Sequence, residues 1–72
     1  MFMFNIKTTD IKDALKKYTA EQRIDMLNYC ANITKKHPRI VIAQLTAYIC
    51  KQYSMSLENA KMIAAAYETY LL

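Results

Sequence analysis

Few side chains in this sequence are of the types that do chemistry, and their spacing does not assemble a site. His37 is the only histidine, and it stands before Pro38, where we expect a helix to end. Cys30 and Cys50 lie far apart in helical patterns without zinc-ligand spacing, so we expect buried, reduced thiols. No glycine-rich phosphate loop is present, and no nucleophile has a histidine nearby in sequence. The sequence therefore predicts a non-enzymatic protein without catalytic residues, metal or cofactor.

Recognition of a macromolecule is the chemistry that remains, and residues 49–63, ICKQYSMSLENAKMI, have the frame of a helix-turn-helix. Ile49 and Cys50 would pack the first helix, and Ser54 takes the turn position where glycine is common. We expect this helix-turn-helix-like unit to span residues 46–70. Any tight two-helix corner obeys the same packing, so a generic corner stays open as an alternative.

The face of the second helix that would enter a major groove is poor in DNA-reading side chains. It consists of Leu57, Glu58, Lys61, Met62 and Ala65. Direct readout uses Arg, Lys, Asn or Gln on base edges, with basic groups on the flanking phosphates. This face instead has one lysine opposed by one glutamate among apolar groups. The alternative of direct DNA contact would rest on three residues, Ser56, Asn59 and Lys61.

Tyrosines gather in the same half of the chain, where Tyr48, Tyr53, Tyr67 and Tyr70 occur. A single tyrosine usually fills a core and leaves its hydroxyl at the surface. Four of them exceed what half of so small a core can bury, and aromatic residues concentrate at interface hot spots. We therefore predict a surface that binds a protein partner, formed by Tyr48, Tyr53, Leu57, Glu58, Lys61, Met62, Ala65, Ala66 and Tyr70.

Helical periodicity accounts for the first half of the chain. Thr8, Thr9 and Asp10 offer an N-cap and a first turn, and an apolar row of Ile11, Ala14, Leu15 and Tyr18 follows. The segment 19–22 is a capping box that begins a second helix, which should stop near the residue before proline. Its wide apolar face is expected to comprise Ala20, Ile24, Met26, Leu27, Cys30, Ala31 and Ile33.

Two further helices follow in the second half. Pro38 suits the first turn of a third helix, and 40–53 is apolar on nearly all sides, which predicts the central buried helix. Ser56 caps a fourth helix that starts at Leu57. Its expected core face is Ala60, Ile63, Ala64, Tyr67 and Leu71, which leaves Met62, Ala66 and Tyr70 on a second apolar stripe.

Composition agrees with a compact all-α bundle of about four helices in a single domain, residues 1–72. The chain has no glycine and one proline, so hairpin signals are missing and positive-φ turns must use Asn or Ser. Residues 1–7 are a candidate N-terminal arm, in which Phe2 and Phe4 either pack over the bundle or cover a partner. Since no signal peptide or membrane span is recognisable, we expect a cytoplasmic protein.

The net charge of +4 is confined to the first half of the sequence. Residues 1–39 carry eight Lys and Arg against four Asp and Glu, whereas residues 40–72 carry two against two. The helix-turn-helix-like half is thus neutral, which argues against electrostatic binding to a duplex. The basic run 35–39 fits a solvated corner at a helix C-terminus, or a contact with phosphate or an acidic partner.

A small, glycine-free chain, rich in lysine and isoleucine, with a degenerate ICKQYSMSLENAKMI frame resembles the small regulators of temperate phages of low-GC Gram-positive bacteria. Within that group it is similar to the antirepressors called modulators of repression. The resemblance covers roughly the second half of the chain. It implies a helical protein that binds the N-terminal DNA-binding domain of a phage repressor and keeps the repressor off its operators.

Mutual exclusion would be the mechanism, because operator and antirepressor would compete for one surface of the repressor. The basic first half could also approach operator phosphates in a joint complex. Two other readings stay open, direct DNA binding and a self-associating helical bundle. Neither a membrane nor a small-molecule substrate is expected as a partner.

Overall fold

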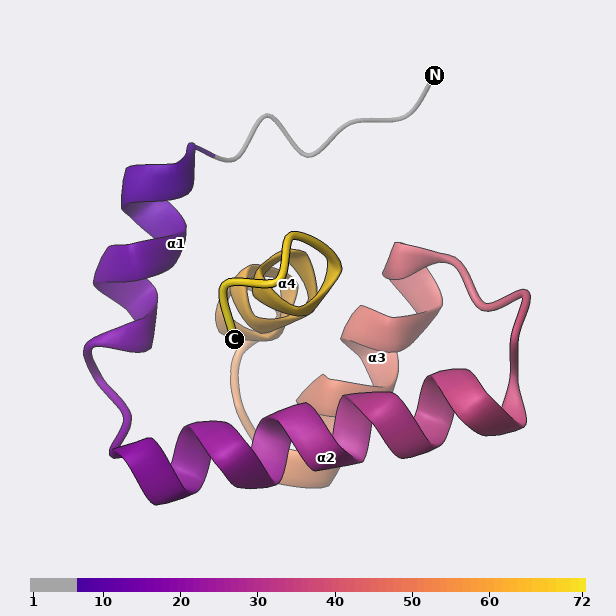
Figure 1. Ribbon diagram of the computed structural model, residues 1–72. Coiled ribbons are helices and arrows are strands. Elements are labelled where there is room, and N and C mark those ends of the chain that lie inside the picture. The colour runs from indigo at the N-terminus through magenta and orange to yellow at the C-terminus, as the bar shows by residue number, and fades with distance from the viewer. Residues whose placement is uncertain (1–6) are drawn as a thin grey trace.

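Four helices and no strand make up the part of the chain that the structure, a computed structural model, describes, residues 7–72. They are α1 (Thr8–Leu15), α2 (Ala20–Lys36), α3 (Ile42–Tyr53) and α4 (Leu57–Glu68). Figure 1 looks along α4, with α1, α2 and α3 on three sides of it. The predicted all-α fold of about four helices is confirmed, whereas residues 1–6 of the candidate arm, with Phe2 and Phe4, lie outside the described residues.

The ends of α2 follow the local signals in the sequence. Thr19 Oγ1 accepts a 3.1 Å hydrogen bond from the Gln22 backbone N–H, and Gln22 Oε1 accepts one of 2.8 Å from the Thr19 N–H. This reciprocal pair is the predicted capping box. At the other end His37 leaves the helical region with φ −130°, as a residue before proline tends to do.

The start of α1 differs slightly from the expectation. Thr8 and Thr9 belong to the first turn of the helix, and Lys7 is the N-cap residue, without a side-chain capping hydrogen bond. Three residues of the expected inward row, Ile11, Ala14 and Leu15, are buried, whereas the fourth, Tyr18, lies beyond the end of the helix and is half-buried.

Pro38 does not belong to the first turn of α3, which corrects the sequence prediction. The Ile40 N–H donates a 2.9 Å hydrogen bond to the His37 carbonyl, so Pro38 and Arg39 are the central pair of a turn. Proline at the second position of such a turn is as well suited as proline in a first helical turn. The helix begins later, at Ile42.

The corner between α3 and α4 spans three residues and fulfils its predicted geometry. Ser54 has φ 51° and ψ 43°, the left-handed conformation that glycine normally supplies. The Met55 N–H then donates 3.3 Å to the Cys50 carbonyl, and Ser56 Oγ accepts 3.1 Å from the Asn59 N–H. Such a corner is common to helix-turn-helix units and to other helix pairs, so the helix-turn-helix identity stays a prediction.

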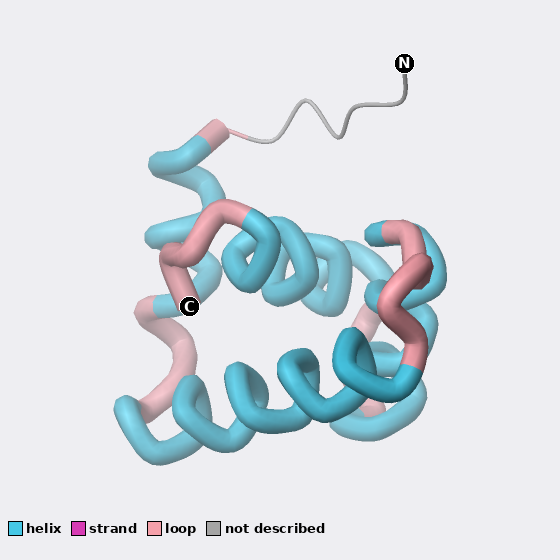
Figure 2. The backbone as a smooth tube through the Cα atoms, turned by 45° about the vertical axis from the view of Figure 1, so that its right-hand side comes forward, coloured by secondary structure: helices cyan, strands magenta, loops and turns pink. Residues whose placement is uncertain are grey.

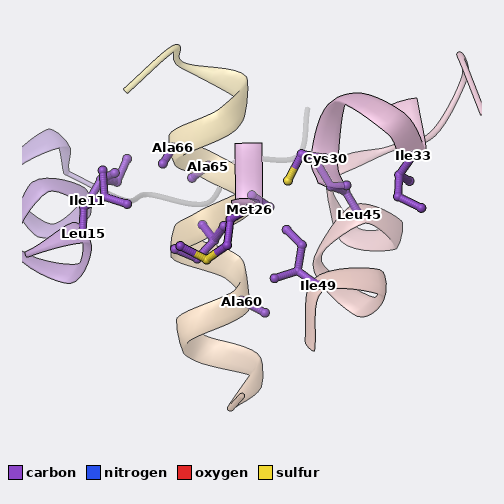
Figure 3. Packing of buried hydrophobic residues seen from close by; sticks show 12 residues of the cluster. Ile11, Leu15, Met26, Cys30, Ile33, Leu45, Ile49, Ala60, Ala65 and Ala66 are labelled. Atoms are coloured by element: carbon purple, nitrogen blue, oxygen red, sulfur yellow. The ribbon is translucent and has the colours of Figure 1, made fainter. Parts of the chain in front are cut away.

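The central helix is α4 and not α3, which corrects the prediction that residues 40–53 form the central buried helix. Five α4 residues are buried, Ala60, Ile63, Ala64, Ala65 and Ala66. Alanine allows neighbouring helices to approach closely, and Figure 3 shows Ala60, Ala65 and Ala66 between side chains of the surrounding helices. The α3 helix buries only one face, formed by Leu45, Thr46 and Ile49.

The apolar face of α2 is divided in two. An inner row of Met26, Cys30 and Ile33 lies in the core, as expected. The other four residues of the predicted face are exposed and form an outer row, Ala20, Ile24, Leu27 and Ala31. The two rows lie roughly 120° apart around the helix, so one small core covers only one of them.

Candidate partner-binding surface

The nine predicted partner-binding residues do not form one surface. Tyr48 lies on the outer side of α3, Leu57 and Glu58 start α4, and Tyr70 follows the end of α4. A helix of 12 residues is about 18 Å long, so the start and the end of α4 cannot share a small contact patch. Figure 2 shows the C-terminal turn directly after α4.

Two of the nine residues cannot contact a partner. Ala65 is 6% exposed and Ala66 is fully buried. Both belong to the central helix, against which α1 packs. The sequence placed them outside because alanine has no strong preference for core or surface, and the position of α1 is a long-range feature.

Tyr53 is half-buried and is held in place by its neighbours. Its ring meets that of Tyr29 edge to face, with 5.7 Å between centroids, and its hydroxyl donates a 2.7 Å hydrogen bond to Asp25 Oδ2. Burial and this carboxylate raise the pKa of Tyr53 above its usual value. Because the hydroxyl stays protonated and engaged, Tyr53 ties α3 to α2.

Tyr48 keeps an accessible ring. It stacks on His37 with 5.8 Å between centroids and 22° between planes, at the corner where α2 turns into α3. Its backbone carbonyl accepts a 3.4 Å hydrogen bond from the Tyr29 hydroxyl. The ring is therefore oriented by the fold, while one side of it remains open to solvent.

Tyr70 is the most exposed of the large hydrophobic residues among residues 7–72, at 96%. It does not continue α4, as the predicted stripe required, because the helix ends at Glu68. Its φ is 61°, and its N–H donates 3.2 Å to the Tyr67 carbonyl while the Leu71 N–H donates 2.8 Å to the Ala66 carbonyl. These two bonds form a Schellman motif, in which glycine usually takes this position.

The start of α4 forms one wall of an open hollow of about 640 Å³. The opposite wall is α1, and the lining comprises Asp10, Asp13, Ala14, Lys17, Ser56, Glu58, Asn59 and Met62. Three carboxylates thus face the hollow against one ammonium group. A second cation lies near by, since Lys16 Nζ is 3.5 Å from Asp13 Oδ1, and both side chains are exposed. Leu57, 61% exposed, is the first residue of α4 and stands between two lining residues in the sequence, but it is not itself part of the lining.

The residues of the alternative DNA site are engaged within the chain. Ser56 Oγ accepts the Asn59 N–H, and Asn59 Oδ1 accepts a 3.4 Å hydrogen bond from Lys17 Nζ. Lys61 is half-buried. Carboxylates at the start of a would-be recognition helix repel phosphates, so this edge favours a cationic or neutral partner over a duplex.

Asp10 and Asp13 were not predicted as functional residues. On α1 they read as ordinary solvent-facing charges, and no local pattern indicates that α1 packs beside the start of α4. Only the tertiary structure brings them together with Glu58, because α1 and the start of α4, more than 40 residues apart in the sequence, line the same hollow. The hydrogen bond between Lys17 and Asn59 shows the same proximity.

The cysteines show no sign of reactivity. Cys30 is fully buried, and burial, together with the charge of Glu68, raises the pKa of its thiol to about 12. Cys50 Sγ donates to the Met55 carbonyl at 3.0 Å, inside the α3–α4 corner. In the described part of the chain, no three His, Cys, Asp or Glu side chains are grouped so as to hold a metal ion.

None of the helices within residues 7–72 combines the length and hydropathy needed to cross a membrane. Comparison of the chain with models of known families, with curated proteins and with solved structures found no match in any of the three. The residues and their geometry are therefore what supports a function.

Proposed function

We propose that this protein is a non-enzymatic regulator of the phage antirepressor type, which binds the DNA-binding domain of a repressor and blocks operator binding. The observation that supports it most is the hollow between α1 and the start of α4, which Asp10, Asp13 and Glu58 line together with apolar Met62, while Leu57 is exposed at the start of the same helix. We call this the acidic edge. It would act in the cytoplasm of a bacterial host.

The chemistry of the acidic edge fits a DNA-reading surface. A DNA-reading surface carries Lys and Arg side chains that bind the phosphates of DNA. The carboxylates of the acidic edge, which are also anionic, would attract the same side chains. Leu57 and Met62 add apolar contact, and methionine adapts to the shape of its partner. A protein that covers the reading helix of the repressor excludes the operator, and the outcome depends on the relative concentrations and affinities of the two competitors.

Direct DNA binding is the competing hypothesis, and the two make opposite demands on the same residues. A duplex needs cations at the start of α4, where the lining has three carboxylates and Lys17. Neutralising Glu58 would thus strengthen duplex binding and weaken repressor binding.

The test is a titration of the repressor N-terminal domain, encoded in the same phage genome, with matched variants of this protein. Leu57→Ala should weaken binding about tenfold, since it removes an exposed apolar group at the start of α4, directly before Glu58 in the sequence. Val41→Ala is the control, because Val41 is 56% exposed but lies at the start of α3. Equal loss from both variants, or none from either, would reject the acidic edge.

A charge test completes the design. Glu58→Lys should weaken binding further, and raising the salt concentration should reduce the difference between this variant and the unaltered protein. An unchanged affinity for Glu58→Lys at low salt would contradict the electrostatic part of the proposal.

A further inference from the structure

The outer row of α2, Ala20, Ile24, Leu27 and Ala31, is a continuous apolar strip that no other described helix covers. Ile24 is 57% exposed and Leu27 is 37% exposed. In both Figure 1 and Figure 2, α2 forms a border of the molecule with no helix on its far side. The strip thus stays open after the described helices have packed.

Its spacing is that of a helix–helix seam. The four residues follow one another at intervals of four, three and four, the alternation that keeps one side of a helix against a parallel or antiparallel neighbour. The inner row has the same kind of spacing, with Met26, Cys30 and Ile33 at intervals of four and three, and these three residues pack in the core. A helix with two such rows is built to pack on two sides.

We propose that the outer row of α2 binds the same row of a second copy of this chain, antiparallel, about a two-fold axis between residues 25 and 26. The order of side-chain sizes supports this, since it reads small, large, large, small from either end. An antiparallel pair places Ile24 against Leu27 of the other copy and Ala20 against Ala31. Such a surface is complementary to itself, as a two-fold interface must be.

Composition favours a second copy over a different protein. The row is wholly aliphatic, like the interior of a homodimer interface. The aromatic and arginine anchors that mark hot spots in other complexes are missing from it. The acidic edge is formed by residues of α1, by Lys17 and by the start of α4, so no residue belongs to both surfaces, and the dimer does not rest on the proposed function.

The charges near the ends of the row predict an unusual salt dependence. In the antiparallel pair, Lys35 and Lys36 at the end of one α2 would approach Lys16, just before the other α2, and in each copy the net positive charge lies in the half of the chain that contains α2. These like charges oppose association and are screened by salt, whereas apolar contact is not. Self-association should therefore strengthen as salt rises, and repressor binding at the acidic edge should weaken.

Sedimentation equilibrium from about 10 μM to 1 mM tests the dimer, because a seam of four residues is shorter than a standard interface and should bind weakly. We expect reversible dimerisation of the unaltered chain that tightens at least threefold between about 0.05 and 0.5 M salt. Ile24→Glu should abolish it, and Val41→Glu, at a similarly exposed position on another element, should not. A monomer throughout the range, or an equally stable dimer for Ile24→Glu, would overturn the proposal.

A mixing experiment tests the orientation. Ile24→Glu and Leu27→Lys should each be monomeric, with helical circular dichroism like that of the unaltered chain. Mixed together they should form a heterodimer, since antiparallel packing brings the new carboxylate beside the new ammonium and leaves one Ile–Leu layer intact. Failure of the mixture to associate while the unaltered chain dimerises through this row would overturn the antiparallel arrangement.

Discussion

The hydroxyl of Tyr53 donates a 2.7 Å hydrogen bond to Oδ2 of Asp25, which joins α3 to α2. With the edge-to-face contact between Tyr53 and Tyr29, it fixes how these two helices meet. This pair is also the reason why a tyrosine of the predicted partner surface turns out to stabilise the fold.

Tyr53→Phe should therefore lower the free energy of unfolding by about 1 kcal/mol, because it removes the hydrogen bond and keeps the ring. Urea unfolding measures the change, and Tyr48→Phe, at an exposed ring, is the control. The raised pKa of Tyr53 means that its protonated hydroxyl stabilises the folded state. This contribution to the free energy of unfolding is fully present below pH 10 and is lost as the pH rises through the folded-state pKa. A Tyr53→Phe variant as stable as the unaltered protein at pH 7 would show that the bond contributes nothing.

Stability should also decline in alkali because of Cys30. Its pKa rises from 9.0 to about 12 on folding, so the unfolded chain loses this proton first. Titration of Cys30 should leave the free energy of unfolding unchanged below pH 9. Between pH 9 and 12 it should lower that free energy by at most about 1.4 kcal/mol per pH unit. Urea unfolding of the reduced protein at several pH values measures the slope. Cys30→Ala should be less stable at pH 7 but show a shallower slope, and an equal slope would assign the decline to other groups.

Enlarging Ala66 should be costly. This residue is fully buried in the central helix, so Ala66→Leu forces extra volume between packed helices and should cost about 1–3 kcal/mol. Ala47→Leu, on the exposed face of α3, should change stability by less than about 0.5 kcal/mol. Thermal unfolding compares the two variants, and a neutral Ala66→Leu would restore the sequence prediction that this alanine faces outward.

Tyr70 should be a position where a smaller residue raises stability. A bulky residue with φ 61° is strained, and glycine adopts this conformation without a steric penalty. Tyr70→Gly should raise the free energy of unfolding by about 0.5–1 kcal/mol. Ser54→Gly, at the other positive-φ position among the described residues, is the matched comparison. Loss of stability in Tyr70→Gly would mean that its ring packs against the fold.

The sequence predicted those features whose cause is local. The capping box of Thr19 and Gln22, the left-handed Ser54 and the cap at Ser56 each depend on a few neighbouring residues, and all three are confirmed. Local signals could not predict which of the two apolar rows of α2 faces the core, because each row satisfies helical periodicity.

Long-range packing decided what the sequence left open. Ala66 is buried because α1, α2 and α3 surround α4, and an alanine by itself does not indicate which helix will be central. Asp13 reaches the start of α4 only through the packing of α1. Pro38 suits a turn as well as a first helical turn, and its neighbours do not distinguish the two.

The most direct test of the proposed function is the anisotropy of a labelled operator duplex, measured with and without the repressor at two salt concentrations. We predict that this protein displaces the repressor from the duplex and does not raise the anisotropy of the duplex alone, with displacement weaker for Leu57→Ala and unchanged for Val41→Ala. Direct binding to the free duplex that Glu58→Gln strengthens and salt abolishes, without displacement of the repressor, would contradict it and establish DNA as the partner.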